Sequence, residues 1–146
     1  MLKKISPDDV DLLCKMNNDI FINEIIYDRN FINRFCKLGQ GFIYYYGDVP
    51  TGYILYGMVW RDNKREFTVV SIGVDIKHRG KGYGRLLLDR LVQSHPDREI
   101  HLNVRETNTV AQKLYSSIGF VKVEEVINYY HQFNENAYHM IKFPSK

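Results

Sequence analysis

The chain has 146 residues, of which 45% are hydrophobic and 25% charged, and its net charge is +3. This composition is typical of an ordinary globular protein and excludes a disordered or collagen-like chain. The longest apolar stretch, Tyr53 to Trp60, is far shorter than the roughly 20 residues that a membrane span needs. A charge this small does not indicate a nucleic-acid binder. We therefore expect one domain over residues 1–146, with no membrane segment and no nucleic-acid partner.

The amino terminus and the cysteines indicate the expected cellular compartment and the redox state of the thiols. No apolar run follows the first lysines, so the start does not resemble a secretion signal, and we expect a cytoplasmic protein. Cys14 and Cys36 stand far apart without a CxxC pattern or a Cys/His cluster, so neither a disulfide nor a metal site is predicted. Both thiols are expected to be reduced and buried on helix faces.

The first half of the chain predicts a strand, two helices and three further strands. Lys3 to Ile5 is the expected strand, and Ser6 caps the first helix with Asp9 in the capping-box position. Asp28 to Leu38 reads as the second helix, ended by Gly39. Four of its apolar residues are expected to face inward: Phe31, Ile32, Phe35 and Leu38. Three strands separated by turn residues follow: Phe42 to Tyr46, Gly52 to Trp60 and Glu66 to Asp75.

The second half alternates helices and strands before it ends in a strand pair. Gly82 to Ser94 and Thr109 to Ile118 have helical periodicity, and Glu99 to Val104 between them is strand-like. Two more strands are expected over Phe120 to Ile127 and Ala137 to Phe143. This order predicts an α+β fold, an α/β/α sandwich in which about four helices cover a mixed, mostly antiparallel, twisted sheet of about seven strands.

A cluster of glycines stands between a predicted strand and a predicted helix. Gly80, Gly82 and Gly84 occupy alternate positions, with Arg79 and Lys81 beside them. A helix N-terminus offers unpaired N–H groups and a positive dipole end, and glycine lets an anion approach the backbone without a Cβ in the way. A simple turn does not need three glycines in this pattern. The segment therefore predicts a phosphate-binding loop.

The spacing of the loop narrows the class of phosphate ligand. A dinucleotide fingerprint needs a third glycine where Arg85 stands, and no GxxxxGK[ST] run is present. The pattern Arg79-x-x-Gly82-x-Gly84 resembles the pyrophosphate-binding motif of the GNAT superfamily of acetyl-CoA-dependent N-acetyltransferases. The segment Leu102 to Asn108, with Tyr115 and then Gly119-Phe120, is similar to the later strand-helix motif of that superfamily.

The resemblance implies a binding site for acetyl-CoA as co-substrate, without a metal. The sheet is then splayed between the strands at 66–75 and 99–104, and the backbone of Ile72 and Val74 pairs with the pantetheine arm, with the Val74 N–H polarising the acetyl carbonyl. Asn108 and Tyr115 line the far side. Five loop residues are implied to hold the pyrophosphate: Arg79, Gly80, Lys81, Gly82 and Gly84.

The implied reaction is direct attack of an amine on the thioester in a ternary complex. Tyr115 is the candidate for protonating the leaving thiolate, with a core aromatic as the alternative reading. Related enzymes place a base where this chain has Asn103 or Thr68, neither of which accepts a proton at neutral pH, so Asn103 is assigned to order a water. Three other residues are candidates for the base: Glu24, Glu66 and His139.

The acceptor is expected to be the N-terminal amine of a protein or peptide, with lysine as a less favoured target. At pH 7, deprotonating a lysine costs about 4.6 kcal/mol and an α-amine about 1.1 kcal/mol, so an enzyme without a strong base suits α-amines. Tyr129 and Tyr130 resemble a peptide-contacting pair in ribosomal-protein-alanine and other N-terminal acetyltransferases. Two alternatives stay open: an acetyltransferase acting on a polyamine, an aminoglycoside or an amino acid, and a non-catalytic module that binds coenzyme A.

Overall fold

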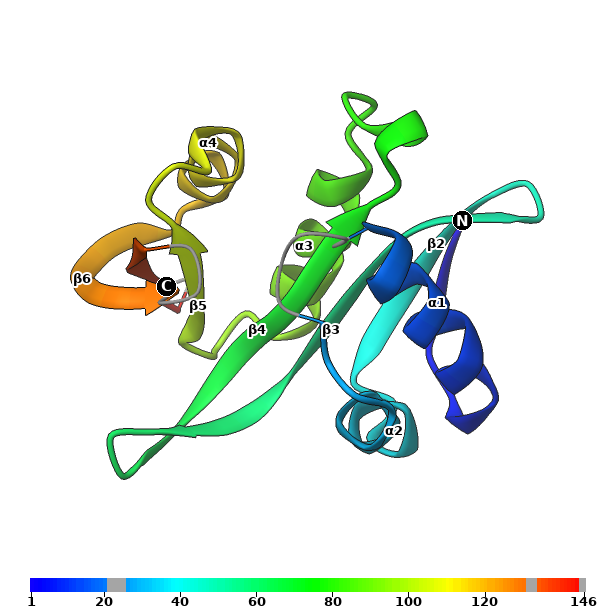
Figure 1. Cartoon of the computed structure of the whole chain (residues 1–146), viewed down its shortest axis with the longest axis horizontal. Coiled ribbons are helices and arrows are strands. Elements are labelled where there is room, and N and C mark those ends of the chain that lie inside the picture. Colours follow the sequence, from blue (N-terminus) through cyan, green and yellow to red (C-terminus); the bar gives the residue numbers. More distant parts are fainter. Residues whose placement is uncertain (21–25, 131–133, 145–146) are drawn as a thin grey trace. The chain divides into compact units, whose positions relative to one another are not determined.

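The computed structural model describes residues 1–20, 26–130 and 134–144. By its contacts the chain divides into two compact units. Unit 1 comprises Met1–Gly57 and Val69–Arg90, and unit 2 comprises Met58–Thr68 and Leu91–Lys146. Because two strands and one helix run through both units, each unit is described by itself; Figure 1 labels the elements in chain order.

Unit 1 holds the amino-terminal strands and the helices that cover them. Strand β1 pairs antiparallel with β2, and β2 pairs antiparallel with β3, with a register shift between Tyr44 and Tyr45. The elements wholly in this unit are β1 (Leu2–Lys4), α1 (Val10–Ile20), α2 (Arg29–Leu38) and β2 (Gly41–Tyr46). Three more lie partly in it: β3 (Val49–Arg61), β4 (Lys64–Val74) and α3 (Tyr83–Ser94).

Helix ends in unit 1 follow the predicted signals. Ser6 and Asp9 form the capping box, although the first turn is a short 3-10 segment, and Gly39 ends α2 in the left-handed conformation at φ +64°. One inward assignment was wrong: Leu38 is 61% exposed. The buried residues of α2 are Ile32, Phe35 and Cys36. At helical spacing the next inward position is 39, so the Leu38 side chain points outward.

The core of unit 1 includes a polar group that is fully satisfied. Tyr53 is completely buried, and its hydroxyl lies 2.8 Å from Ser71 Oγ and accepts a hydrogen bond from Asn17 Nδ2 at 2.9 Å. Burial raises the pKa of Tyr53 to about 12, so the phenol stays protonated. These bonds tie α1, β3 and β4 together beside the apolar residues of the core.

Unit 2 is built on three strands and the tip of the β3–β4 hairpin. Strand β5 pairs parallel with β4 at Thr68 and His101, and antiparallel with β7 along its length. Strand β7 pairs antiparallel with β6. The elements that lie wholly in this unit are β5 (Ile100–Arg105), α4 (Thr109–Ile118), β6 (Val121–Tyr130) and β7 (Glu135–Lys142).

The predicted fold class is confirmed. Within the described residues there are four α-helices and a mostly antiparallel sheet, whose hydrogen-bonded strand order is β1-β2-β3-β4-β5-β7-β6. The splay between β4 and β5 stays a prediction. In the part of the chain that the structure describes, no helix is long and apolar enough to span a membrane.

Candidate functional site

The glycine loop of unit 1 connects β4 to α3 through a short 3-10 turn. Asp75 caps that turn, its Oδ1 accepting the Lys77 N–H at 3.1 Å. Gly80 and Gly82 have φ values of +78° and +83°, and a Cβ added at either would meet no atom within 4 Å. Left-handed backbone of this kind favours glycine. The loop therefore presents bare backbone at the start of α3.

Two basic side chains stand beside this bare backbone. Arg79 and Lys81 are both exposed. Arg79 Nε donates to the carbonyl oxygen of Val74 at 3.0 Å, which ties the guanidinium to the end of β4. The Gly82 carbonyl accepts the Leu86 N–H at 3.1 Å and so begins the first turn of α3. Positive side chains and a helix N-terminus thus meet in one loop, an arrangement suited to a phosphate group.

The end of β4 directs alternate backbone groups to opposite sides. The Asp75 N–H donates to the Thr51 carbonyl of β3 at 2.8 Å, and the Gly73 carbonyl oxygen would lie 3.0 Å from a Cβ at Gly52. Positions 73 and 75 therefore face β3. Because backbone groups alternate along a strand, those of Ile72 and Val74 point away from β3. These are the two residues that the sequence analysis assigns to the pantetheine arm.

Helix α4 in unit 2 carries two of the predicted coenzyme residues. Asn108 is its N-cap, the side-chain oxygen accepting the Ala111 N–H at 3.2 Å. The sequence analysis did not assign this role, although Asn at a helix start is a capping signal. Tyr115 is buried, and its ring centroid lies 6.0 Å from that of Phe120. Tyr115 is thus held in a defined place on the helix.

The two tyrosines assigned to the acceptor lie on β6 itself. The sequence analysis ended this strand at Ile127, but the structure continues it to Tyr130. The rings of Tyr129 and Tyr130 meet edge to face with their centroids 4.9 Å apart, and Tyr129 is 44% exposed. The pair therefore offers aromatic surface at the end of the β6–β7 hairpin.

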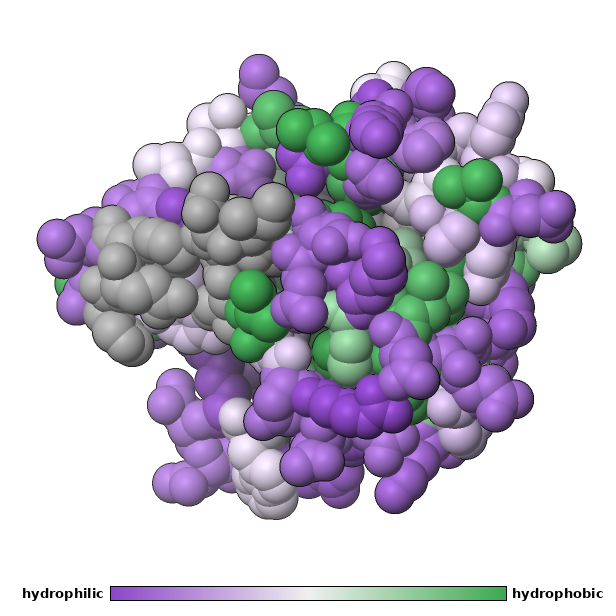
Figure 2. Space-filling model, turned by 45° about the vertical axis from the view of Figure 1, so that its right-hand side comes forward, coloured by the Kyte–Doolittle hydropathy of each residue, from purple (hydrophilic) through white to green (hydrophobic). Residues whose placement is uncertain are grey.

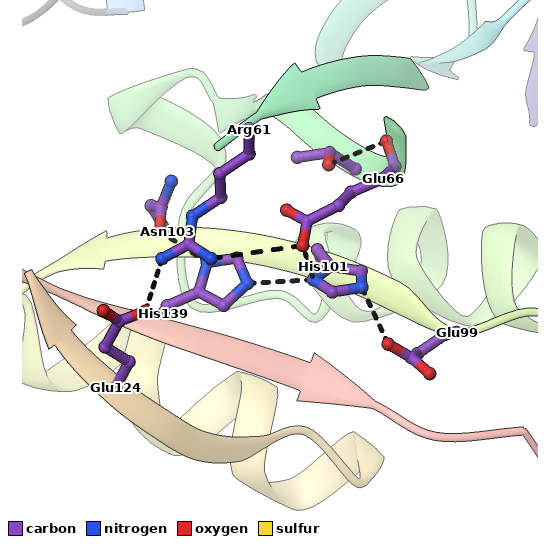
Figure 3. A network of polar contacts seen from close by, with 8 residues as sticks. Arg61, Glu66, Glu99, His101, Asn103, Glu124 and His139 are labelled. Carbon is purple, nitrogen blue, oxygen red and sulfur yellow. Dashed lines mark hydrogen bonds and ion pairs between the residues drawn. The ribbon is translucent and has the colours of Figure 1, made fainter. Parts of the chain in front are cut away.

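A cluster of polar side chains lies on β4, β5 and β7 in unit 2 (Figure 3). Asn103 Oδ1 lies 2.8 Å from His139 Nδ1, and His139 Nε2 lies 2.8 Å from His101 Nδ1. The far nitrogen of His101, Nε2, lies 3.0 Å from Glu99 Oε1, and Glu66 Oε2 lies 3.4 Å from His101 Nδ1. One carboxylate oxygen and one nitrogen of each ring lie within 4.8 Å of one another.

The structure brings together residues that the sequence analysis named one by one. Asn103, Glu66 and His139 were separate candidates, whereas Glu24 lies outside the described residues. His101 was missed. Its signal was the two-residue period of the predicted strand Glu99 to Val104, which places Glu99, His101 and Asn103 on one face.

Arg61 borders the cluster on its β6 side. Its Nη2 contacts Glu124 Oε2 at 2.5 Å, and its Nη1 is 4.0 Å from Glu66 Oε2 (Figure 3). Burial, reinforced by the nearby Arg61 and His101, lowers the pKa of His139 to about 4. The His139 ring is therefore neutral at physiological pH.

The cysteines of unit 1 offer no reactive thiol. Cys36 is fully buried and Cys14 half-buried, both among the apolar residues of the core. Burial raises the pKa of both thiols, that of Cys36 to about 11. Since the thiolate is the nucleophile, this environment suits packing rather than catalysis.

Comparison with known proteins gives the class of this chain. The acetyltransferase (GNAT) family matches residues 12–120. The chain therefore belongs to this family.

Individual relatives are similar over part of the chain. The N-alpha-acetyltransferase RimI of Mycobacterium tuberculosis is 35% identical over 94 residues, which cover 64% of this chain and 60% of that protein. The L-amino acid N-acyltransferase MnaT of Escherichia coli is 37% identical over 78 residues, covering 50% and 45%. The first relatives that the chain matches are covered over only 38%, 60% and 47% of their own lengths.

Among solved structures, the ribosomal-protein-S18-alanine N-acetyltransferase of Escherichia coli has the same fold. It superimposes with a TM-score of 0.83 at 20% identity, covering 100% of this chain and 96% of that one. This likeness concerns the fold.

Proposed function

We propose that this chain transfers the acetyl group of acetyl-CoA to a primary amine, and that the acceptor is the N-terminal amine of a protein or peptide. The observation that carries the proposal is the glycine loop. Gly80 and Gly82 leave the backbone open at the start of α3, beside Arg79 and Lys81. This is the chemistry that holds a diphosphate, and the family supplies the identity of its carrier.

Backbone groups of β4 extend the proposed coenzyme site from the loop. Ile72 and Val74 face away from β3, so their N–H groups and the Ile72 carbonyl suit the amides of a pantetheine arm, while the Val74 carbonyl accepts Arg79 Nε. The Val74 N–H polarises the acetyl carbonyl in this proposal and stabilises the negative charge that develops on its oxygen. The likeness of the segment around Asn108 and Tyr115 to the later motif of the family is what assigns these two α4 residues to the coenzyme in this proposal.

The proposed reaction needs two proton movements. The neutral amine attacks the carbonyl carbon, a C–N bond forms, and the C–S bond breaks to release the thiolate of coenzyme A. Tyr115 gives its proton to that thiolate. The nitrogen loses its extra proton to water ordered by Asn103, whose amide cannot take the proton itself.

Three arguments favour an N-terminal amine as the acceptor. An α-amine is about 3.5 kcal/mol cheaper to deprotonate at pH 7 than a lysine, which matters where the strand position of the base is occupied by an amide. Tyr129 and Tyr130 offer aromatic surface with hydroxyls for a peptide backbone. RimI, the relative from Mycobacterium tuberculosis, is an N-alpha-acetyltransferase.

A free amino acid is the second candidate acceptor. The relative from Escherichia coli, an L-amino acid N-acyltransferase, is 37% identical over its matched segment. The amine of a free amino acid is also an α-amine, so the argument from proton affinity does not separate it from a peptide. It differs in carrying a carboxylate next to the amine.

The proposal is tested by offering the full chain acetyl-CoA and four kinds of amine: a panel of peptides with free N-termini, N-terminally blocked lysine peptides, free amino acids and spermidine. Mass spectrometry identifies the acetylated product. We expect the free N-terminal peptides to give the highest kcat/KM. A higher value for amino acids or spermidine contradicts the peptide assignment, and acetyl-CoA binding without any product supports the non-catalytic module.

A further inference from the structure

Polar side chains normally lie at the surface of a protein, and hydrophilic residues dominate the coloured part of the face in Figure 2. Two histidines of unit 2 depart from this pattern. His101 is 6% exposed and His139 is 2% exposed, on the neighbouring strands β5 and β7. Burying a polar group costs free energy unless the group is hydrogen-bonded. The partners of the two rings therefore show what their burial achieves.

Hydrogen bonds join the two rings into one chain that ends at Asn103 (Figure 3). At one end, Glu99 Oε1 lies 3.0 Å from His101 Nε2. His101 Nδ1 lies 2.8 Å from His139 Nε2, and Glu66 Oε2 lies 3.4 Å from the same His101 nitrogen. At the other end, His139 Nδ1 lies 2.8 Å from Asn103 Oδ1. All four ring nitrogens therefore have a hydrogen-bond partner.

The chain holds one of the two polar atoms of the Asn103 amide. Asn103 lies opposite His139 in the register of β5 and β7, and its Oδ1 is the atom that faces the ring. Among the described residues its Nδ2 has no hydrogen-bond partner, and the side chain is half-buried. Because the amide is planar, fixing its oxygen also fixes the direction in which its nitrogen donates. Asn103 thus presents a free donor in a defined direction.

The His139 ring is poorly placed to take a proton from an acceptor amine itself. Both of its nitrogens are engaged at 2.8 Å, and almost none of the side chain is exposed. Burial, reinforced by the nearby Arg61 and His101, lowers its pKa to about 4, so the ring binds a proton only weakly at neutral pH. The ring therefore suits a supporting role better than the role of a base.

We propose that His139 is a positioning residue that acts through Asn103, with His101 and Glu99 holding the ring from its other side. The inference rests on the proposed function, in which Asn103 orders the water that receives the proton of the attacking amine. A water that accepts a hydrogen bond from Nδ2 keeps a lone pair for that proton and passes one of its own to solvent. A misplacement of about 1 Å at such a step costs about 100-fold in rate.

Two substitutions of His139 separate a positioning role from that of a base, because each keeps the contact on one side of the ring. The amide of an asparagine takes about the place of Nδ1, so His139→Asn keeps a polar group facing Asn103 and loses the contact with His101. The amide of a glutamine takes about the place of Nε2, so His139→Gln keeps the contact with His101 and loses the one with Asn103. Neither variant retains an imidazole.

Steady-state kinetics with the preferred acceptor of the wild-type chain measures the difference. We expect His139→Gln to lower kcat by about 10- to 100-fold, and His139→Asn to lower it by only about threefold. The KM for acetyl-CoA should stay within about twofold of the wild-type value in both. Asn103→Ala should lower kcat as much as His139→Gln does, and combining the two should cost nothing further, because residues that act as a unit are not additive.

His95→Gln is the matched control, because His95 belongs to the same unit and its Nδ1 contacts the Leu91 carbonyl oxygen outside the cluster. It should leave kcat unchanged. Equal losses in His139→Asn and His139→Gln would contradict the proposal and identify the ring as the base. Losses that multiply in the double variant would also contradict it, because His139 would then act independently of Asn103.

Glu99→Leu tests the chain from its exposed end and covers the case in which His139→Gln does not fold. The Glu99 side chain is 50% exposed, so its replacement leaves the interior of unit 2 intact, which circular dichroism verifies. We expect a loss in kcat of about threefold that disappears in the Asn103→Ala background. A loss that persists there would contradict the proposal. No product from the wild-type chain would overturn the proposed function itself, whereas an active wild type with any of these contrary results overturns the positioning role alone.

Discussion

The glycine loop of unit 1 and the polar cluster of unit 2 are built in opposite ways. The loop consists of consecutive residues whose backbone forms the binding surface, and its side chains add charge at the rim. The cluster consists of side chains from β4, β5 and β7, with His101 and His139 38 residues apart. The residues of the loop are neighbours in the sequence, whereas the residues of the cluster come together only when the strands pair.

Tyr115→Phe gives the largest expected effect; Tyr115 lies on α4, outside both sites, and the variant separates turnover from coenzyme binding. The change removes one hydroxyl from a buried ring, so the fold and the binding of acetyl-CoA should be retained. If the phenol protonates the thiolate, kcat falls by about 10²- to 10⁴-fold. Steady-state kinetics and calorimetric binding of acetyl-CoA measure the two quantities. An unchanged kcat would show that another group supplies the proton.

Gly82→Val tests the backbone character of the loop. The valine side chain would enter the open space and strain a backbone at φ +83°, so acetyl-CoA affinity should fall at least tenfold. Gly47→Val is the matched control. Gly47 has φ +60° and equally open surroundings in a turn of the same unit, so it carries similar strain without touching the loop. Equal losses of affinity in the two variants would trace the effect to general strain.

Asn103→Leu probes the side-chain character of the cluster through stability. It leaves Nδ1 of the buried His139 without its hydrogen-bond partner, which costs about 1–3 kcal/mol of unfolding free energy. Asn18→Leu on the exposed side of α1 is the control and should change stability by less than about 0.5 kcal/mol. Urea unfolding measures both. A cost no greater than that of the control would show that the histidine pair does not depend on this bond.

The smallest effect concerns the thiols of unit 1. With a pKa of about 11, the thiolate fraction of Cys36 at pH 8 is on the order of 0.1%, and the side chain is also buried. We expect Ellman's reagent to leave Cys36 unmodified in the folded chain and to reach it after unfolding in urea. Rapid reaction of Cys36 in the folded state would indicate that the core opens readily.

Local signals explain how much of the fold could be predicted from the sequence. Gly39 and Gly119 end α2 and α4 in the left-handed conformation, as glycine after a periodic run indicates. Leu38 was wrong because periodicity gives the direction of an apolar face only approximately, and Cys36 takes the inward place four residues after Ile32. The end of β6 was placed too early because Asn128, a residue type common in turns, follows Ile127; it has a φ of +54° where the β6–β7 register shifts.

Local sequence signals also decide which parts of the candidate site could be predicted. The roles of Arg79, Gly80 and Gly82 could be proposed because their spacing carries the information. The meeting of Glu66, His101 and His139 could not, because it depends on the register of three strands, in which Asn103 stands opposite His139. A period of two along β5 shows that residues share a face, but not what the neighbouring strand places beside them.

The central claim is that the loop from Arg79 to Gly84 binds the diphosphate of acetyl-CoA. Calorimetric titration of the wild-type chain with acetyl-CoA and with acetyl-pantetheine, which lacks the diphosphate and the nucleotide, tests it most directly. We expect one acetyl-CoA per chain and at least 100-fold weaker binding of acetyl-pantetheine. In Gly82→Val, the affinity for acetyl-CoA should fall most of the way to that for acetyl-pantetheine. Equal affinity for the two ligands, or no binding of acetyl-CoA, would contradict the account.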